Sequence, residues 1–126
     1  MKKKLFSKNV PPPIGPYSQA VSYNGLIYTS GQISIDNSGN VTSSDIESQT
    51  RTVLTNIQSL LNENNSGLGE VLKVTIYLKS MDEFAAMNKV YAEFFGTSLP
   101  ARSTIEVSRL PKDVKVEIDV VAIQNN

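Results

Sequence analysis

His and Cys, the residue types on which many metal sites and activated nucleophiles depend, are both absent from the 126 residues. Their absence excludes Cys/His zinc sites, cysteine nucleophiles and every catalytic triad with a histidine base. Carboxylates, arginines, hydroxyls and backbone groups remain for chemistry. Two placements are notable: Arg102 follows Pro100-Ala101 where a strand is expected to start, and Glu117 lies between the apolar residues Val116 and Ile118 of another expected strand.

Arg102 and Glu117 could share one small substrate only under a geometric condition. If the last two strands form an antiparallel hairpin, Arg102 lies opposite Val121, four positions along from Glu117. At about 3.3 Å per strand residue this separation is roughly 13 Å, which is too far within a single chain. A shared site would therefore need a subunit boundary. The alternative is that Glu117 lies on a solvated sheet face and pairs with Lys115 or Arg109.

The elements that position these residues follow from the pattern of apolar residues within one expected domain, residues 1–126. Asn24-Gly25 separates two β-rich runs, 19–23 and 26–30, and this predicts a hairpin. Residues 36–40 predict a second turn, but they lack the ligand spacing of a calcium loop. We expect no metal site.

Two helices and one strand are predicted next along the chain. Capping-box spacing at 44–47 precedes a helix that ends at the stop signals in 65–67, and a second capping box at 80–83 opens a helix closed by Gly96. Between them, residues 72–79 alternate as in a strand with one buried face. The predicted buried positions are Ile46, Val53, Leu54, Ile57, Leu60 and Leu61, then Leu72, Val74, Ile76 and Leu78, then Phe84, Met87, Tyr91, Phe94 and Phe95.

The last third of the chain predicts two strands, 102–109 and 114–123, which gives the order ββ(β)αβαββ. This order indicates an α+β fold, a mixed β-sheet with both helices packed on one face. The opposite face has a mixed polar and apolar character, and this favours burial against another subunit in a closed cyclic assembly. In the last strand that face would carry Lys115, Glu117, Asp119, Val121 and Ile123.

Charge and hydropathy limit the possible partners. The 12 Lys and Arg residues balance 12 Asp and Glu residues, and the pI is near 6.2. The chain therefore has no overall basic field to hold phosphates, and we do not expect it to be a general nucleic-acid-binding protein. The Lys2-Lys3-Lys4 run is expected to be a solvated terminus. No secretory signal is visible, and the longest apolar run, 120–123, is far too short to cross a membrane. We expect a soluble, cytoplasmic protein that binds no membrane.

Four stretches of the chain resemble the signature of the Rid family of reactive intermediate deaminases, also called the YjgF family: 13–20, 27–32, 87–95 and 100–118. The resemblance implies a chorismate-mutase-like fold and a homotrimer with a central barrel, helices outside and active sites between adjacent subunits. In the deaminase (RidA-like) subgroup it implies hydrolysis of 2-imino acids or their enamine tautomers, such as 2-iminobutanoate and 2-iminopropanoate, to 2-keto acids and ammonia. No cofactor is implied.

The resemblance also assigns roles by position. Arg102 would grip the substrate carboxylate, which suits a planar guanidinium, and Glu117 would hold and activate the attacking water. The remaining substrate-binding positions would be Tyr17 lining the cleft, Ser30 and Gly31 lending polar and backbone contacts, Asn88 walling the pocket, and Thr104, whose contact is expected through its backbone.

The chain departs from the family pattern at Thr104, where many members have Cys, and at Asp119, where Glu is common. Ordinary structural explanations also exist for three of the implied site positions. Tyr17 could be a packed turn aromatic, Ser30-Gly31 an ordinary strand end, and Asn88 a polar contact along a helix.

Two other classes of function remain open from the sequence. One is a regulatory trimer that senses a small carboxylate and binds a protein partner, such as a transcription factor, without turnover. The other is the ribonuclease or translation-inhibitor activity attached to some relatives of the family. A neutral chain without His or a basic stripe is a poor candidate for the latter.

Overall fold

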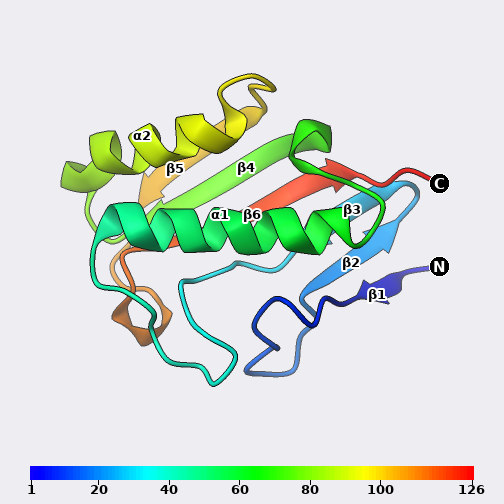
Figure 1. Cartoon of the computed structure of the whole chain (residues 1–126), viewed down its shortest axis with the longest axis horizontal. Coiled ribbons are helices and arrows are strands. Elements are labelled where there is room, and N and C mark those ends of the chain that lie inside the picture. Colours follow the sequence, from blue (N-terminus) through cyan, green and yellow to red (C-terminus); the bar gives the residue numbers. More distant parts are fainter.

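The predicted hairpin is present in the computed structural model, which describes residues 1–126 (Figure 1). It joins strand β2 (Ala20–Tyr23) to strand β3 (Leu26–Thr29), which pair antiparallel. Asn24 and Gly25 have φ angles of 52° and 77°. A two-residue turn of this kind requires left-handed backbone at both positions, and Asn and Gly adopt it most readily.

The N-terminal lysine run is part of the sheet and not a free terminus. Strand β1 (Lys3–Leu5) pairs antiparallel with β2 and forms one edge of the sheet. The expectation of a solvated terminus was correct for the lysine side chains, which are exposed, and wrong for the backbone. The reason is Leu5, which packs against the main core and so holds this segment beside β2.

Helix α1 (Ile46–Asn62) has the predicted buried face but a different capping residue. The Asp45 carboxylate accepts a hydrogen bond from the backbone N–H of Ser48 at 2.9 Å. Asp45, and not Ser44, is therefore the N-cap, because the helix begins one residue later than capping at Ser44 would require. The chain leaves the helix through Asn65, whose φ is 59°.

Strand β4 (Val71–Leu78) confirms the alternation at all but one predicted position. Val74, Ile76 and Leu78 are fully buried, whereas Leu72 is 47% exposed. The prediction for Leu72 was wrong because a register shift between Val71 and Lys73 interrupts the pairing with the last strand. Such a bulge rotates the alternation by one residue, so Val71 enters the core instead.

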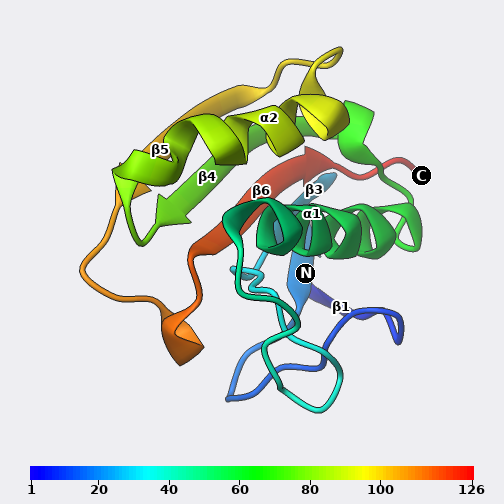
Figure 2. The same ribbon diagram turned by 60° about the vertical axis from the view of Figure 1, so that its left-hand side comes forward.

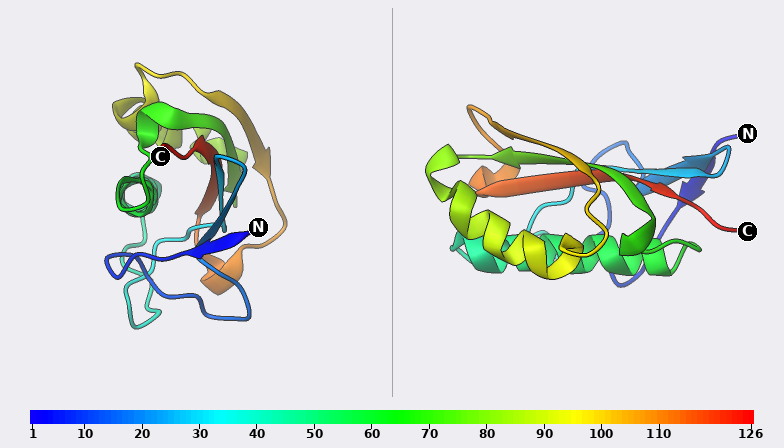
Figure 3. Two further views of the ribbon diagram at one scale, coloured as in Figure 1. Left: turned by 90° about the vertical axis from the view of Figure 1, so that its right-hand side faces the viewer. Right: turned by 90° about the horizontal axis from the view of Figure 1, so that it is seen from above.

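Helix α2 (Phe84–Phe95) follows a short 3-10 turn (Met81–Glu83) that Ser80 caps through a hydrogen bond from the N–H of Asp82. Of its predicted apolar face, Met87, Tyr91 and Phe95 are buried, and the other two aromatics pack partly against the core. Both helices lie on one face of the sheet (Figure 3). A core of 20 buried residues fills the space between the two layers.

The last two strands, β5 (Ala101–Glu106) and β6 (Val116–Ile123), do not form the predicted hairpin. The sheet order is β1-β2-β3-β6-β4-β5, so β4 lies between them, antiparallel to β6 and parallel to β5 (Figure 2). The helical crossover from β4 through α2 places β5 parallel beside β4. The more apolar β6 then takes the central position, where β3 and β4 cover both its edges.

The two faces of β6 differ as the alternation predicted. Val116, Ile118 and Val120 point toward the helices and are at most 1% exposed. Glu117 and Asp119 are half-buried on the open face, which no helix covers. Among the helices, none has the length and apolar character needed to cross a membrane.

Candidate active site

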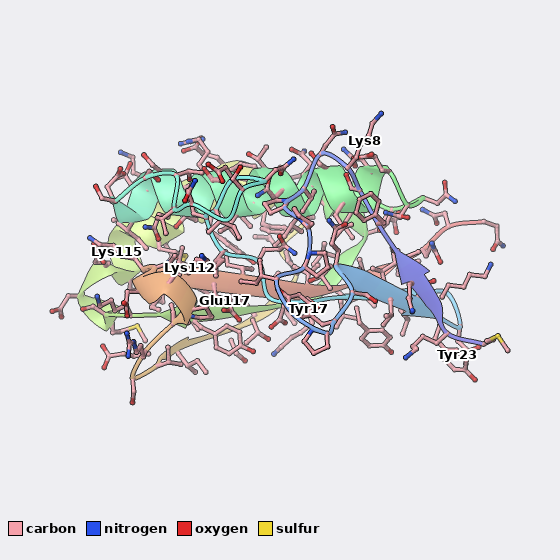
Figure 4. All side chains as sticks on the ribbon, turned by 90° about the horizontal axis from the view of Figure 1, so that it is seen from below. Lys8, Tyr17, Tyr23, Lys112, Lys115 and Glu117 are labelled. Carbon is pink, nitrogen blue, oxygen red and sulfur yellow. The ribbon has the colours of Figure 1, made fainter.

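The first of two clefts, which we call the glutamate cleft, lies where the N-terminal loop meets the ends of β3 and β6. It has a volume of about 320 Å³ and is lined by four of the residues that the sequence implicated: Tyr17, Ser30, Gly31 and Glu117. Figure 4 shows Tyr17 and Glu117 reaching this region from the loop and from β6. The proline segment 11–13 and apolar side chains complete the lining.

Glu117 is held in the glutamate cleft by close packing and not by hydrogen bonds. A Cβ atom placed on Gly31 would overlap Oε2 of Glu117 and lie 2.7 Å from its Cδ, so only glycine leaves room for the carboxylate. Burial, and second the charge of Asp119, raise the pKa of Glu117 above its ordinary value. No ion pair within the chain involves Glu117, and the carboxylate is therefore free to accept a proton.

Ser30 and Gly31 line the same cleft. The Ser30 hydroxyl donates to the Ser18 carbonyl at 2.6 Å, and the Ser30 N–H donates to the Gln19 carbonyl at 2.9 Å. The N–H of Gly31 makes no hydrogen bond within the chain. This N–H and the lone pairs of the Ser30 hydroxyl are available to a ligand.

Gln19 is a structural residue of the cleft that the sequence did not identify. It is 2% exposed, and its side-chain amide donates to the carbonyls of Ser7, Val10 and Pro11 at 3.1 to 3.3 Å. Its carbonyl accepts from the Ser7 N–H at 2.7 Å. These bonds fix the proline segment that walls the cleft. The partners lie 8 to 12 residues away in irregular chain, where no periodic pattern exists to reveal them.

The second cleft, which we call the arginine cleft, lies between α2 and the segment that leads into β5, with a volume of about 470 Å³. Arg102 donates from Nη1 to Oδ1 of Asn88 at 2.6 Å. Its guanidinium carbon lies 4.7 Å from the Tyr91 ring centre and 5.5 Å from that of Phe84. One face of α2 therefore orients the guanidinium through one hydrogen bond and two aromatic rings.

Arg102 is fixed in position but not neutralised. It takes part in none of the ion pairs within the chain. Beside it, the Tyr91 hydroxyl is buried without a hydrogen-bond partner. Burial raises the pKa of Tyr91, and Arg102 opposes that shift. An oriented guanidinium without a carboxylate partner is suited to bind a carboxylate on another molecule.

Thr104 lies on the same side of β5 as Arg102. Its hydroxyl is buried without a hydrogen-bond partner. The N–H of Val107 donates to the Leu78 carbonyl at 2.9 Å. Because backbone groups alternate in direction along a parallel strand, the N–H groups of Arg102 and Thr104 point toward the open edge of β5. The backbone N–H of Thr104 is therefore available to a ligand or a neighbouring chain at that edge.

The two clefts lie on opposite faces of the sheet. Arg102 is opposite Val74 in β4 and contacts α2, whereas Glu117 is opposite Tyr77 on the open face. Two strand spacings of about 4.8 Å and three residues of about 3.3 Å separate their Cα atoms by roughly 14 Å. The expected separation thus stands, although its basis in a hairpin was wrong. One chain does not bring all the implicated residues together.

The model of the endoribonuclease L-PSP family matches residues 7–124. The chain belongs to this family, which is the Rid or YjgF family. A RutC family protein of Pyrococcus horikoshii is 52% identical over 97% of this chain and 98% of its own length. The 2-iminobutanoate/2-iminopropanoate deaminase of Salmonella typhimurium is 37% identical over 98% of this chain and 99% of its own length. A crystal structure of Escherichia coli TdcF with bound serine, 33% identical, has a TM-score of 0.91 and covers 98% of this chain and 99% of that one.

Proposed function

We propose that this Rid-family protein hydrolyses reactive 2-imino acids and their enamine tautomers, among them 2-iminobutanoate and 2-iminopropanoate, to 2-keto acids and ammonia. The observation that carries the proposal is an oriented Arg102 without a carboxylate partner, combined with a desolvated Glu117 that no cation neutralises. The deaminase name of the Salmonella relative and the serine bound to TdcF support a ligand resembling an amino acid.

We propose further that the active unit is a homotrimer of single-domain chains, with the three sheets forming a central barrel. Two observations support it. The open sheet face exposes large apolar side chains, including Tyr28 at 44% and Ile105 at 45%. The arginine and glutamate clefts lie on opposite faces of one chain, so a site that uses both needs the arginine cleft of one protomer against the glutamate cleft of its neighbour.

Substrate binding in such a site begins with the carboxylate. The planar guanidinium of Arg102 can donate two parallel hydrogen bonds to it, and Asn88 keeps the fork in one orientation. The Thr104 N–H at the open edge of β5 is a further donor. On the other side, the Gly31 N–H and the Ser30 hydroxyl face the reacting end of the substrate. No cofactor is required for this binding.

Hydrolysis then needs one proton carrier. A water oxygen forms a bond to the imine carbon while Glu117 takes one of its protons, and the C=N electron pair moves to nitrogen. Glu117 returns that proton to the nitrogen, the C–N bond breaks, and the remaining hydroxyl proton passes to Glu117 and then to solvent. The products are a 2-keto acid and ammonia, which takes up a proton from the solvent. A protonated imine is already a strong electrophile, so this modest machinery suffices.

The test is an assay in which an amino-acid oxidase or a dehydratase generates the imine and a nucleophilic trap reports what remains. The protein should accelerate imine loss, and Arg102→Ala should abolish the acceleration. Arg109→Ala is the matched control, because Arg109 is exposed and pairs only with Asp113 at 2.8 Å. Imine decay that is the same with and without the protein would remove the proposed activity. If binding of 2-ketobutanoate persisted in that case, the sensing function would replace it.

A further inference from the structure

Two polar side chains accompany Glu117 on the open face of the sheet. Asp119 lies two residues further along β6, about 7 Å between Cα atoms, and points to the same face. Tyr77 of β4 is the cross-strand partner of Glu117, yet its hydroxyl donates to Oδ2 of Asp119 at 3.1 Å. Tyr77 therefore bridges the two positions and fixes one carboxylate but not the other.

The lysines near Glu117 and Asp119 contact other groups and not these two carboxylates. Lys115, which directly precedes β6, contacts Glu83 at 3.3 Å. Lys79, the residue after β4, lowers the pKa of Asp113, which also pairs with Arg109. The Lys112 ammonium lies near Gly39 in the turn at 36–40.

The remaining elements around Glu117 bring no charge of their own. The N-terminal loop contributes Tyr17, the segment after β3 contributes Ser30 and Gly31, and β5 contributes Ile105 on this face. After burial, the charge of Asp119 is the second cause of the raised pKa of Glu117. In the proposed trimer, Arg102 of a neighbouring protomer would be added, equally in every variant considered below.

The two carboxylates have different surroundings. Burial raises the pKa of each, but the hydrogen bond from Tyr77 counteracts this for Asp119 alone. Two adjacent carboxylates in a poorly solvated place cannot both ionise freely, and the one whose charged form is hydrogen-bonded keeps its charge to lower pH. The first proton that the pair takes up therefore resides on Glu117.

We propose that Asp119, fixed by the Tyr77 hydroxyl, is a positioning residue that stays ionised and keeps the transferable proton on Glu117. The role of that proton in imine hydrolysis rests on the proposed function, whereas its location does not. The negative charge of Asp119 makes the Glu117 carboxylate a stronger base toward the attacking water. It also keeps Glu117 protonated up to a higher pH, at which it must still donate a proton to the nitrogen of the substrate.

Direct titration of Glu117 tests the location of the proton. The side-chain carboxyl carbon is followed by 13C NMR in the wild type, Asp119→Asn, Tyr77→Phe and the control Asp82→Asn, which makes the same change at an exposed position before α2. Asp119→Asn should lower the Glu117 midpoint by about 0.5 to 1 pH unit. Tyr77→Phe should lower it by less, because Asp119 loses its hydrogen bond and protonates more readily. Asp82→Asn should leave it unchanged.

The rate profile then tests the role of the proton. In Asp119→Asn the acid limb of kcat/KM should move to lower pH by the same amount as the NMR midpoint, and the plateau should fall roughly threefold as Glu117 becomes a weaker base. An unchanged or raised Glu117 midpoint in Asp119→Asn overturns the proposal. If that variant fails to fold, an unchanged midpoint in Tyr77→Phe does so. NMR shifts as expected in a protein without imine hydrolysis would uphold the location of the proton and overturn the proposed function.

Discussion

Gly31 is the residue whose side chain, or lack of one, most directly sets the position of Glu117. A methyl group at this position would occupy space now taken by the Glu117 carboxyl group. The obstructing atoms belong to the end of a flexible side chain and not to the backbone, so the fold can accommodate alanine by moving Glu117. The carboxylate would then leave the place from which it meets water.

Gly31→Ala should therefore lower kcat by about 10- to 100-fold while leaving the melting temperature nearly unchanged, because a displacement of about 1 Å at a catalytic group costs this much. The imine-trap assay and a thermal melt measure the two quantities. Gly69→Ala is the control, since a Cβ there meets no atom within 4 Å. Full activity in Gly31→Ala would show that the contact does not position Glu117.

Glu117 also has a predictable effect on stability. The pKa of Glu117 is raised in the folded chain, so the folded state binds the proton more tightly than the unfolded state does. The free energy of unfolding therefore falls as the pH rises from the pKa of Glu117 in the unfolded state to its higher pKa in the folded state. At pH 7 the ionised carboxylate is therefore a net cost. Glu117→Gln should melt at an equal or higher temperature than the wild type at pH 7, and the difference should vanish below about pH 4. A lower melting temperature at pH 7 would contradict this sign.

At the scale of elements, α2 performs two tasks with overlapping sets of residues. Its buried face completes the core, and the positions of Phe84, Asn88 and Tyr91, spaced by four and three residues, hold Arg102. Asn88→Ala should raise KM and lower kcat/KM by about tenfold, since the guanidinium loses the hydrogen bond that orients it. Gln58→Ala on the exposed side of α1 provides the control. Unchanged kinetics in Asn88→Ala would mean that the two rings alone suffice.

The elements also show where sequence patterns suffice and where they fail. Periodicity predicted the hairpin at Asn24-Gly25, both helices and the alternation along β6, because each depends on residues near in sequence. It could not predict that β4 separates β5 from β6, since strand order depends on the crossover through α2. The prediction that Leu72 is buried was wrong for a related reason, because the position of a bulge depends on the partner strand. The cap at Asp45 differed by a single residue.

The candidate site follows the same division. Arg102 and Glu117 were conspicuous by their types and places, and the resemblance supplied Tyr17, Ser30 and Asn88, which line the two clefts. The hydrogen bonds of Gln19 to the N-terminal segment and of Tyr77 to Asp119 could not be predicted, because they join segments that are distant in the sequence. The sequence therefore pointed to the candidate groups, Arg102 and Glu117, more readily than to the residues that hold their surroundings in place.

At the scale of the whole molecule, the separation of the two clefts has a consequence for subunit mixing. For the proposed homotrimer, equal amounts of Arg102→Ala and Glu117→Gln chains, each expected to be inactive alone, are unfolded together and refolded as a mixture. A site is complete when an Arg102→Ala chain supplies Glu117 and its neighbour, a Glu117→Gln chain, supplies Arg102. Random assembly puts this combination at about one site in four, so the mixture should recover about a quarter of wild-type activity.

The matched control mixes wild-type chains with the double variant Arg102→Ala/Glu117→Gln. Before exchange this mixture has half of the wild-type activity, and after refolding it should fall to about a quarter, because a site shared between protomers is then complete only where two wild-type chains are neighbours. Recovery in the first mixture together with loss in the second requires that each site draw Arg102 and Glu117 from different protomers. If native mass spectrometry shows mixed trimers but the second mixture stays at one half and the first recovers nothing, the two residues do not act across a subunit boundary, and each chain would have to carry its own complete site despite the roughly 14 Å between them.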